Sequence, residues 1–146
     1  MPSKFLEKII NWKIIAFAFL IPLFFLPFTL EAYEFNKNIL LFVFVGVFLI
    51  FWLLKMALAG KFVFRKTALD LPVLAFAGTF ILTTVINSPN KLETLWQPGA
   101  TGTIIILTFF YFLLTNNLKK ETLEKILKAL SLSTILLVLL STYQFI

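Results

Sequence analysis

KMALAGKFVFRKTALDLP, residues 55–72, separates two long apolar runs and decides how the whole chain is arranged. It contains four cations, namely Lys55, Lys61, Arg65 and Lys66. It ends with Asp70 and Pro72, residue types that are typical of the start of a helix. Loops rich in Lys and Arg remain on the cytoplasmic side of a membrane. The stretch is therefore predicted to be a cytoplasmic loop between two membrane spans, and it sets the side of every other segment.

The composition excludes an ordinary soluble domain. Of the 146 residues, 60% are hydrophobic and only 14% are charged, and the apolar residues form runs long enough to cross a bilayer. The formal net charge is +6, but the cations lie between apolar runs and not along one face or arm. We therefore interpret the charge as a topology signal beside anionic lipid headgroups and predict no nucleic-acid partner.

The apolar runs predict an all-α, polytopic integral membrane protein with about five transmembrane helices. The expected spans are residues 12–30, 38–59, 70–87, 101–116 and 128–146. A run of about 20 residues, at about 1.5 Å per residue, crosses the roughly 30 Å hydrocarbon layer. A signal peptide is the alternative for the first run, but the sequence TLEAYEF after it lacks the small residues of a cleavage site.

A short amphipathic helix is expected at residues 119–130, before the last span. Four apolar residues recur there at helical spacing: Leu123, Ile126, Leu127 and Leu130. Glu and Lys pairs four residues apart occupy the opposite face. This pattern favours a helix lying at the membrane interface, and a helix that docks on a calmodulin-like partner is the less favoured alternative.

Two helix faces rich in small or polar residues are predicted to point toward other helices. The face in residues 70–87 consists of Ala75, Gly78, Thr79, Leu82 and Thr83. The face in the last span consists of Ser131, Thr134, Ser141 and Thr142.

The distribution of cations predicts the orientation of the chain. Eleven of the 13 Lys and Arg residues fall in segments expected on one side, and only Lys37 and Lys91 fall on the other. The N-terminus is therefore predicted to be cytoplasmic. The last apolar run stops without a polar tail, so we also expect the chain to be part of a longer protein.

No catalytic or metal-binding set is predicted. The chain has no His and no Cys, and its five glycines are too scattered for a phosphate-binding loop. No cofactor is therefore expected. Weak candidates for substrate binding remain in the external loop, residues 88–101, where Lys91 suits a phosphate and Trp96 suits a sugar ring or the lipid boundary. Gln97 is the third candidate, and an ordinary role as loop residues is the favoured alternative for all three.

Four segments resemble the N-terminal spans of the O-antigen ligase and polymerase-like family of bacterial inner-membrane proteins. The segments are RKTALDLPVLAF (65–76), LTTVINSPN (82–90), TGTIIILTFFYFLLTNN (101–117) and FLPFTLEAYEFNKNILL (25–41). The resemblance implies a glycosyltransferase of polysaccharide biosynthesis that moves a glycan from an undecaprenyl-pyrophosphate carrier to an acceptor on the periplasmic side, without a metal. The arginines and histidine important in that family lie in a later periplasmic loop, so no catalytic residue is carried over to this chain.

Two rival hypotheses stay open. A small, non-catalytic membrane scaffold or accessory subunit is favoured by the absence of reactive groups. A truncated transporter is disfavoured because charged residues are missing from the middles of the predicted spans. In each case the expected partners are membrane lipid and other helices, either of a longer chain or of another subunit.

Overall fold

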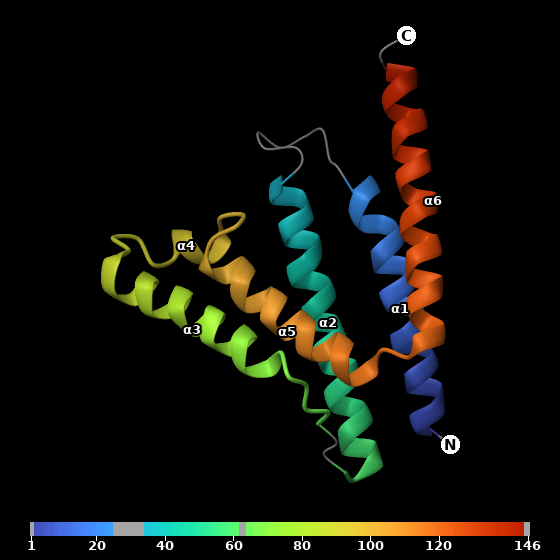
Figure 1. Cartoon of the computed structure of the whole chain (residues 1–146), viewed down its shortest axis with the longest axis horizontal. Helices are drawn as coiled ribbons and strands as arrows, with labels where there is room; N and C mark the ends of the chain where they lie inside the picture. Colours follow the sequence, from blue (N-terminus) through green and yellow to red (C-terminus); the bar gives the residue numbers. More distant parts are fainter. Residues whose placement is uncertain (1, 25–33, 62–63, 145–146) are drawn as a thin grey trace.

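The computed structural model describes residues 2–24, 34–61 and 64–144, and their regular structure is entirely helical. There are five long helices and one single-turn helix, α4 (Figure 1). Their bounds are α1 (Pro2–Leu23), α2 (Glu34–Ala59), α3 (Asp70–Asn87), α4 (Glu93–Trp96), α5 (Thr101–Asn117) and α6 (Lys120–Gln144).

Four helical segments are long and apolar enough to cross a membrane: Glu34–Ala59, Asp70–Asn87, Glu93–Asn117 and Lys120–Tyr143. They overlap four of the five predicted spans, and the last two segments each begin eight residues before the predicted span. α1 begins ten residues before the predicted first span, at Pro2 and not at residue 12, and its charged first half keeps it outside this group. The outer part of that predicted span, residues 25–30, lies outside the described residues.

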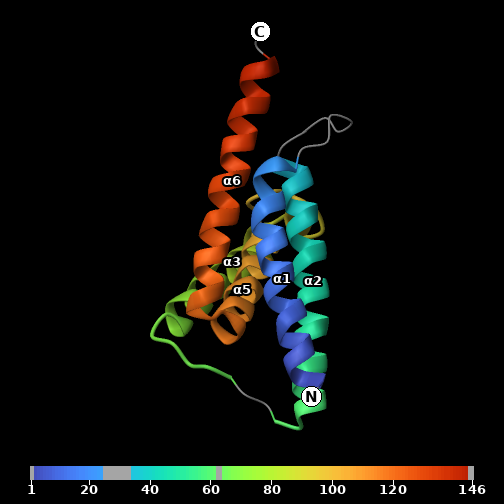
Figure 2. The ribbon, with the colours of Figure 1, turned by 90° about the vertical axis from the view of Figure 1, so that its right-hand side faces the viewer.

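The core forms where α1 packs between α2 and α6, with one side of α5 added (Figures 1 and 2). Its buried residues are Ile10, Ile14, Phe17, Leu41, Val45, Phe48, Trp52 and Leu113. The ring of Phe17 stacks on that of Phe44 with 4.0 Å between centroids, and the edge of Phe110 meets it at 5.6 Å. Offset and edge-to-face aromatic pairs of this kind add specificity to apolar packing.

α6 corrects the prediction of a separate interfacial helix. Residues 120–144 form one continuous helix, so the amphipathic segment and the last span are a single element. α6 makes the most extensive contact in the molecule, with α1. Its inward stripe consists of Thr122, Ile126, Ala129 and Ser133, spaced three or four residues apart. Leu123 and Leu127, predicted on the apolar face of the interfacial helix, are 44% and 56% exposed.

Apart from the half-buried Gly78, the residues of both predicted small-residue faces are exposed in the described chain, so their contact with other helices stays a prediction. On α3 the inward residues are Val73, Ala77 and Thr84, whereas Ala75, Thr79, Leu82 and Thr83 are exposed. On α6 the predicted residues Ser131, Thr134, Ser141 and Thr142 are all exposed, and Ser133 is fully buried instead. The exposed hydroxyls of Thr79, Thr83, Ser131, Thr134 and Thr142 each donate to a backbone carbonyl one turn earlier. They therefore need no neighbouring helix to satisfy them.

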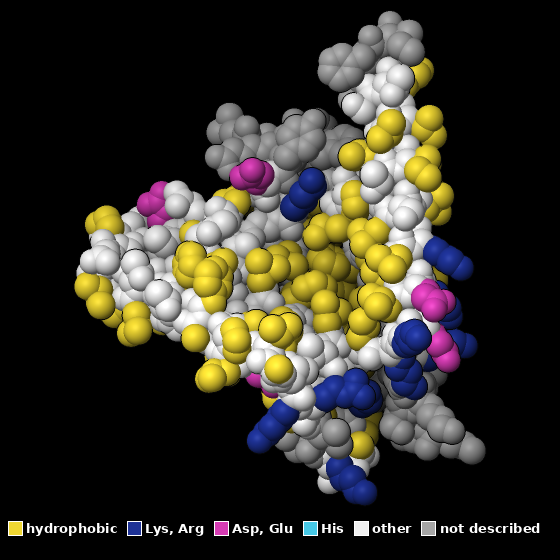
Figure 3. Space-filling model, in the orientation of Figure 1, with side chains coloured by type: hydrophobic (Ala, Val, Ile, Leu, Met, Phe, Trp, Pro, Cys, Tyr) yellow, Lys and Arg dark blue, Asp and Glu magenta, His cyan; other side chains and the backbone are white. Residues whose placement is uncertain are grey.

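α3 and α5 run side by side and cross α2 obliquely, whereas α1, α2 and α6 run nearly alongside one another (Figures 1 and 2). The end of α2, the start of α3 and the end of α5 meet at one end of the molecule, near the starts of α1 and α6. Lys and Arg side chains gather at this end (Figure 3). The segments that the sequence assigns to one side of a membrane thus lie together in space.

Candidate functional site

Helix α5 is fastened at each end by a group of polar side chains. The first group, the C-terminal cluster of α5, joins Tyr111, Asn116 and Asn117 of α5 to Lys55, Arg65, Thr67 and Asp70. The second, the N-terminal cluster of α5, joins Thr103 of α5 to Asn38, Trp96, Gln97 and Gly99. A buried or half-buried polar group is costly without a partner, so each cluster fixes the position of the loop beside it.

Asp70 organises the C-terminal cluster. It is the first residue of α3, and its carboxylate accepts hydrogen bonds from the backbone N–H of Thr67 at 2.9 Å and from the Thr67 hydroxyl at 2.6 Å. The hydroxyl of Tyr111 donates to the same carboxylate at 3.0 Å and also contacts the Thr67 hydroxyl. The sequence predicted Asp70 as a helix cap. The structure places Leu69 at the cap position, with Asp70 holding the loop from the first turn.

The rest of the basic loop is tied to the last turn of α5. The backbone N–H of Arg65 donates to the side-chain oxygen of Asn116 at 2.6 Å, and the ammonium of Lys55 donates to that of Asn117 at 3.2 Å. The two asparagines also donate to carbonyls of their own helix, at Phe112 and Leu113. These two asparagines therefore bind the end of α2 and the basic loop that follows it.

Asp70→Asn is expected to lower the melting temperature in detergent. The carboxylate accepts three hydrogen bonds, and hydrogen bonds to a charged acceptor are stronger than those to an amide. Glu124→Gln is the matched control, because Glu124 is exposed on α6 and the substitution removes the same charge. Thermal unfolding of the two variants measures the effect. If both changes lower the melting temperature equally, the cluster makes no specific contribution to stability.

The N-terminal cluster of α5 borders an opening at the opposite end of the molecule. Asn38 donates to the carbonyl of Trp96 at 3.3 Å and accepts from the hydroxyl of Thr103 at 3.0 Å. A cavity of about 390 Å³ lies beside it. The cavity is lined by Ile21, Glu34, Lys37, Asn38, Leu41, Pro98, Gly99 and Thr103. Its polar groups are the Lys37 ammonium, the Glu34 carboxylate, the Asn38 amide and the Thr103 hydroxyl, and the last two are bonded to each other. The ammonium is the group that suits an anionic ligand.

None of the three predicted site residues lines this cavity. The ring of Trp96 stacks on that of Phe42, 5.8 Å away, and remains 60% exposed. The amide of Gln97 donates to the carboxylate of Glu93 at 3.0 Å. Lys91 is exposed on the loop before α4. The structure therefore brings the backbones of Trp96 and Gln97 to the cluster and leaves Lys91 apart from it.

Sequence reasoning missed Asn38 and Thr103, although Lys37 was noted as one of two cations on this side. Asn38 was treated as the first residue of an apolar run, and Thr103 as part of a short span. Asn38 bonds to Trp96, which is 58 positions away in the chain, and to Thr103, which is 65 positions away. A lone amide at the start of an otherwise apolar run is the one local signal that could have indicated Asn38.

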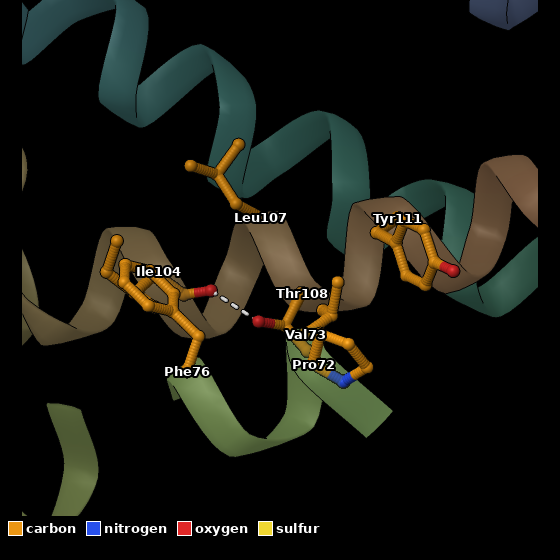
Figure 4. A pocket seen from close by; sticks show the side chains of 7 residues that line it. All are labelled: Pro72, Val73, Phe76, Ile104, Leu107, Thr108 and Tyr111. Atoms are coloured by element: carbon orange, nitrogen blue, oxygen red, sulfur yellow. Dashed lines mark hydrogen bonds between the residues drawn. The ribbon is translucent and has the colours of Figure 1, made fainter. Parts of the chain in front are cut away.

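A second cavity, of about 330 Å³, lies between α3 and α5 and is apolar (Figure 4). The hydroxyl of Thr108 on its wall donates to the carbonyl of Ile104 in its own helix, and that of Tyr111 is engaged with Asp70. No free polar group in this wall is therefore available to orient a ligand.

Within the described residues, no three His, Cys, Asp or Glu side chains lie close enough to hold a metal ion. The chain matches no known protein family, no curated protein and no solved structure.

Proposed function

We propose that the chain is the N-terminal membrane part of an O-antigen ligase or polymerase-like glycosyltransferase in the bacterial inner membrane. Such an enzyme moves a glycan from an undecaprenyl-pyrophosphate carrier to an acceptor on the periplasmic side. In this proposal the lysine-rich end of the molecule is cytoplasmic, and the N-terminal cluster of α5 is periplasmic. The sequence resemblance in residues 25–41, 65–76, 82–90 and 101–117 supports the family assignment.

The cavity beside Lys37 is the structural observation that supports the proposal. A lipid-linked glycan needs an opening at the membrane surface, a cation for the pyrophosphate and hydrogen-bonding groups for the sugar. The cavity has Lys37 as the cation for the pyrophosphate, and Asn38 and Thr103 as hydrogen-bonding groups for the sugar hydroxyls. This part of the enzyme would hold and orient the carrier, and bond making and breaking would fall to other residues of the enzyme.

The native polypeptide, tagged at its N-terminus at the chromosomal locus, is expected to be several times larger than 16.8 kDa. A photoreactive undecaprenyl-phosphate analogue is expected to label it, and Lys37→Gln to reduce that labelling. Lys91→Gln is the matched control, because it removes the other cation of the same side without touching the cavity. Unchanged labelling of the Lys37 variant, or a stable native product of about 17 kDa, would contradict the proposal.

A small membrane scaffold or accessory subunit is the second candidate. It is favoured by the outer half of α6, where Ile135, Val138 and Leu139 are each more than half exposed along the helix. A native product of about 17 kDa that co-purifies with another membrane protein, and loses it when these residues change, would support this candidate over the first.

A further inference from the structure

The starts of α1 and α6 enclose a cavity of about 430 Å³ that neither the core nor the proposed carrier site uses. Its lining consists of Lys8, Asn11, Trp12, Ile15, Lys119, Glu121, Thr122 and Lys125. Three lysines face one carboxylate, so the cavity is electropositive. It lies at the cation-rich end of the molecule, where α1 and α6 run side by side (Figures 1 and 2). We call it the lysine cavity.

Asn11, which lines the lysine cavity, has a side-chain atom without a hydrogen-bond partner. Its side-chain oxygen is buried and is the one side-chain nitrogen or oxygen in the described part of the chain that is buried without a hydrogen-bond partner. Elsewhere in the described core, buried amides such as Asn117 are bonded within the protein. The Asn11 oxygen can only accept a hydrogen bond, so its partner must be a donor such as water, a neighbouring ammonium group or a hydroxyl group of a ligand.

The surroundings of the lysine cavity match a lipid more closely than a free anion. Trp12 is 72% exposed at its edge, and indoles of this kind favour the boundary between headgroups and acyl chains. A second opening, of about 340 Å³, shares Lys8 and Trp12 with it. Further along α6, Leu132, Leu136 and Leu139 follow Lys125 at 7, 11 and 14 positions, on the same side of the helix, and all three are exposed.

We propose that the lysine cavity binds the phosphate headgroup of an anionic glycerophospholipid from the leaflet at the cation-rich end. Lys8 and Lys125 would pair with the phosphate, and the acyl chains would run past Trp12 and along the exposed leucines of α6. Basic pockets between helices on the cytoplasmic side are a recognised setting for anionic headgroups. The proposal does not depend on the glycosyltransferase assignment.

Native mass spectrometry of the purified full chain tests this, with phosphatidylglycerol and phosphatidylcholine added separately. The expected result is one retained phosphatidylglycerol and no retained phosphatidylcholine at the same collision energy. Replacing Lys8 and Lys125 together by Gln is expected to weaken phosphatidylglycerol binding about 25-fold, at about fivefold for each lysine. Both side chains are exposed, so the double variant is expected to unfold at the same temperature as the parent.

The matched control replaces Lys61 and Lys128 together by Gln. Both lie at the same end of the molecule, both are exposed, and neither lines the lysine cavity. Binding close to that of the parent is expected. An equal loss in the two double variants would show general charge attraction and overturn the proposal, as would equal retention of phosphatidylcholine. Displacement of the lipid by excess glycerol 3-phosphate would show that phosphate alone is recognised, and would overturn the lipid assignment.

Discussion

Gly102→Ala is expected to lower the melting temperature far more than the same substitution at the other helical glycines. Gly102 lies in the first turn of α5, directly under the backbone of α4. A Cβ atom there would lie 2.7 Å from the carbonyl carbon of Leu95 and closer still to its oxygen. Backbone atoms cannot rotate away as a side chain can, so α4 and α5 must move apart. Overpacking of this kind typically costs about 1–3 kcal/mol.

The controls are Gly46→Ala and Gly78→Ala. A Cβ at either position meets no atom within 4 Å, and alanine favours a helix by about 1 kcal/mol over glycine. Neither is expected to destabilise the protein. The local effect can be followed at Thr101, which is 5% exposed. Because the chain has no Cys, Thr101→Cys supplies a single thiol, and its maleimide reactivity should rise when Gly102→Ala is added. Unchanged reactivity and stability would show that α4 does not rest on Gly102.

Ser133→Leu is expected to separate α6 from α1. Ser133 is fully buried on the inward stripe of α6, in the most extensive helix contact of the molecule. A leucine there places four side-chain heavy atoms where serine has two, at a position that is 0% exposed. The expected loss is about 1–3 kcal/mol of stability, measured by thermal or denaturant unfolding in detergent.

Thr134→Leu is the control for Ser133→Leu. The two hydroxyls donate to the same carbonyl, that of Leu130, at 3.0 and 2.8 Å, so both changes remove an equivalent hydrogen bond. They differ in that Thr134 is exposed. Thr134→Leu is therefore expected to leave stability nearly unchanged. The opposite ranking would support the sequence-based prediction that Thr134 faces another helix.

The boundaries of α3 and α5 were the most predictable part of the fold. The predicted span at residues 70–87 matches α3, and that at residues 101–116 differs from α5 by one residue. Polar residues interrupt the apolar runs at these points, and a backbone in lipid must satisfy its hydrogen bonds within a helix. The continuity of α6 was not predictable in the same way. Its charged first turns and apolar remainder differ in composition, but nothing at residues 128–131 breaks a helix.

The faces of the helices could not be predicted from the sequence. In water, an apolar stripe identifies the buried side of a helix, but in lipid both the outer and the packed sides are apolar. On α3 the small residues Ala75 and Thr79 suggested one face, yet Ala77 is the buried residue. On α6 the choice between Ser133 and Thr134 has no local signal, since each hydroxyl can bond to its own helix.

The candidate site was predictable only as a region. The turn-rich sequence around residues 88–101 indicated a loop, and the structure contains one, with α4 as its single turn. The polar groups that give the cavity its character come from α2 and α5, through Asn38 and Thr103. Contacts of this kind depend on how distant segments pack, which a single sequence does not contain.

The packing of α1 against α6 also sets an order of events during synthesis. About 100 residues separate the end of α1 from the start of α6, and ribosomes add about 5–20 residues per second. α1 therefore waits about 5–20 seconds for its main neighbour and meets α2 first. The early product is an α1–α2 hairpin in which the side of α1 that α6 later covers remains open. Ribosomal arrest before Lys120 would leave that hairpin as an open, half-assembled intermediate, available to membrane chaperones and proteases.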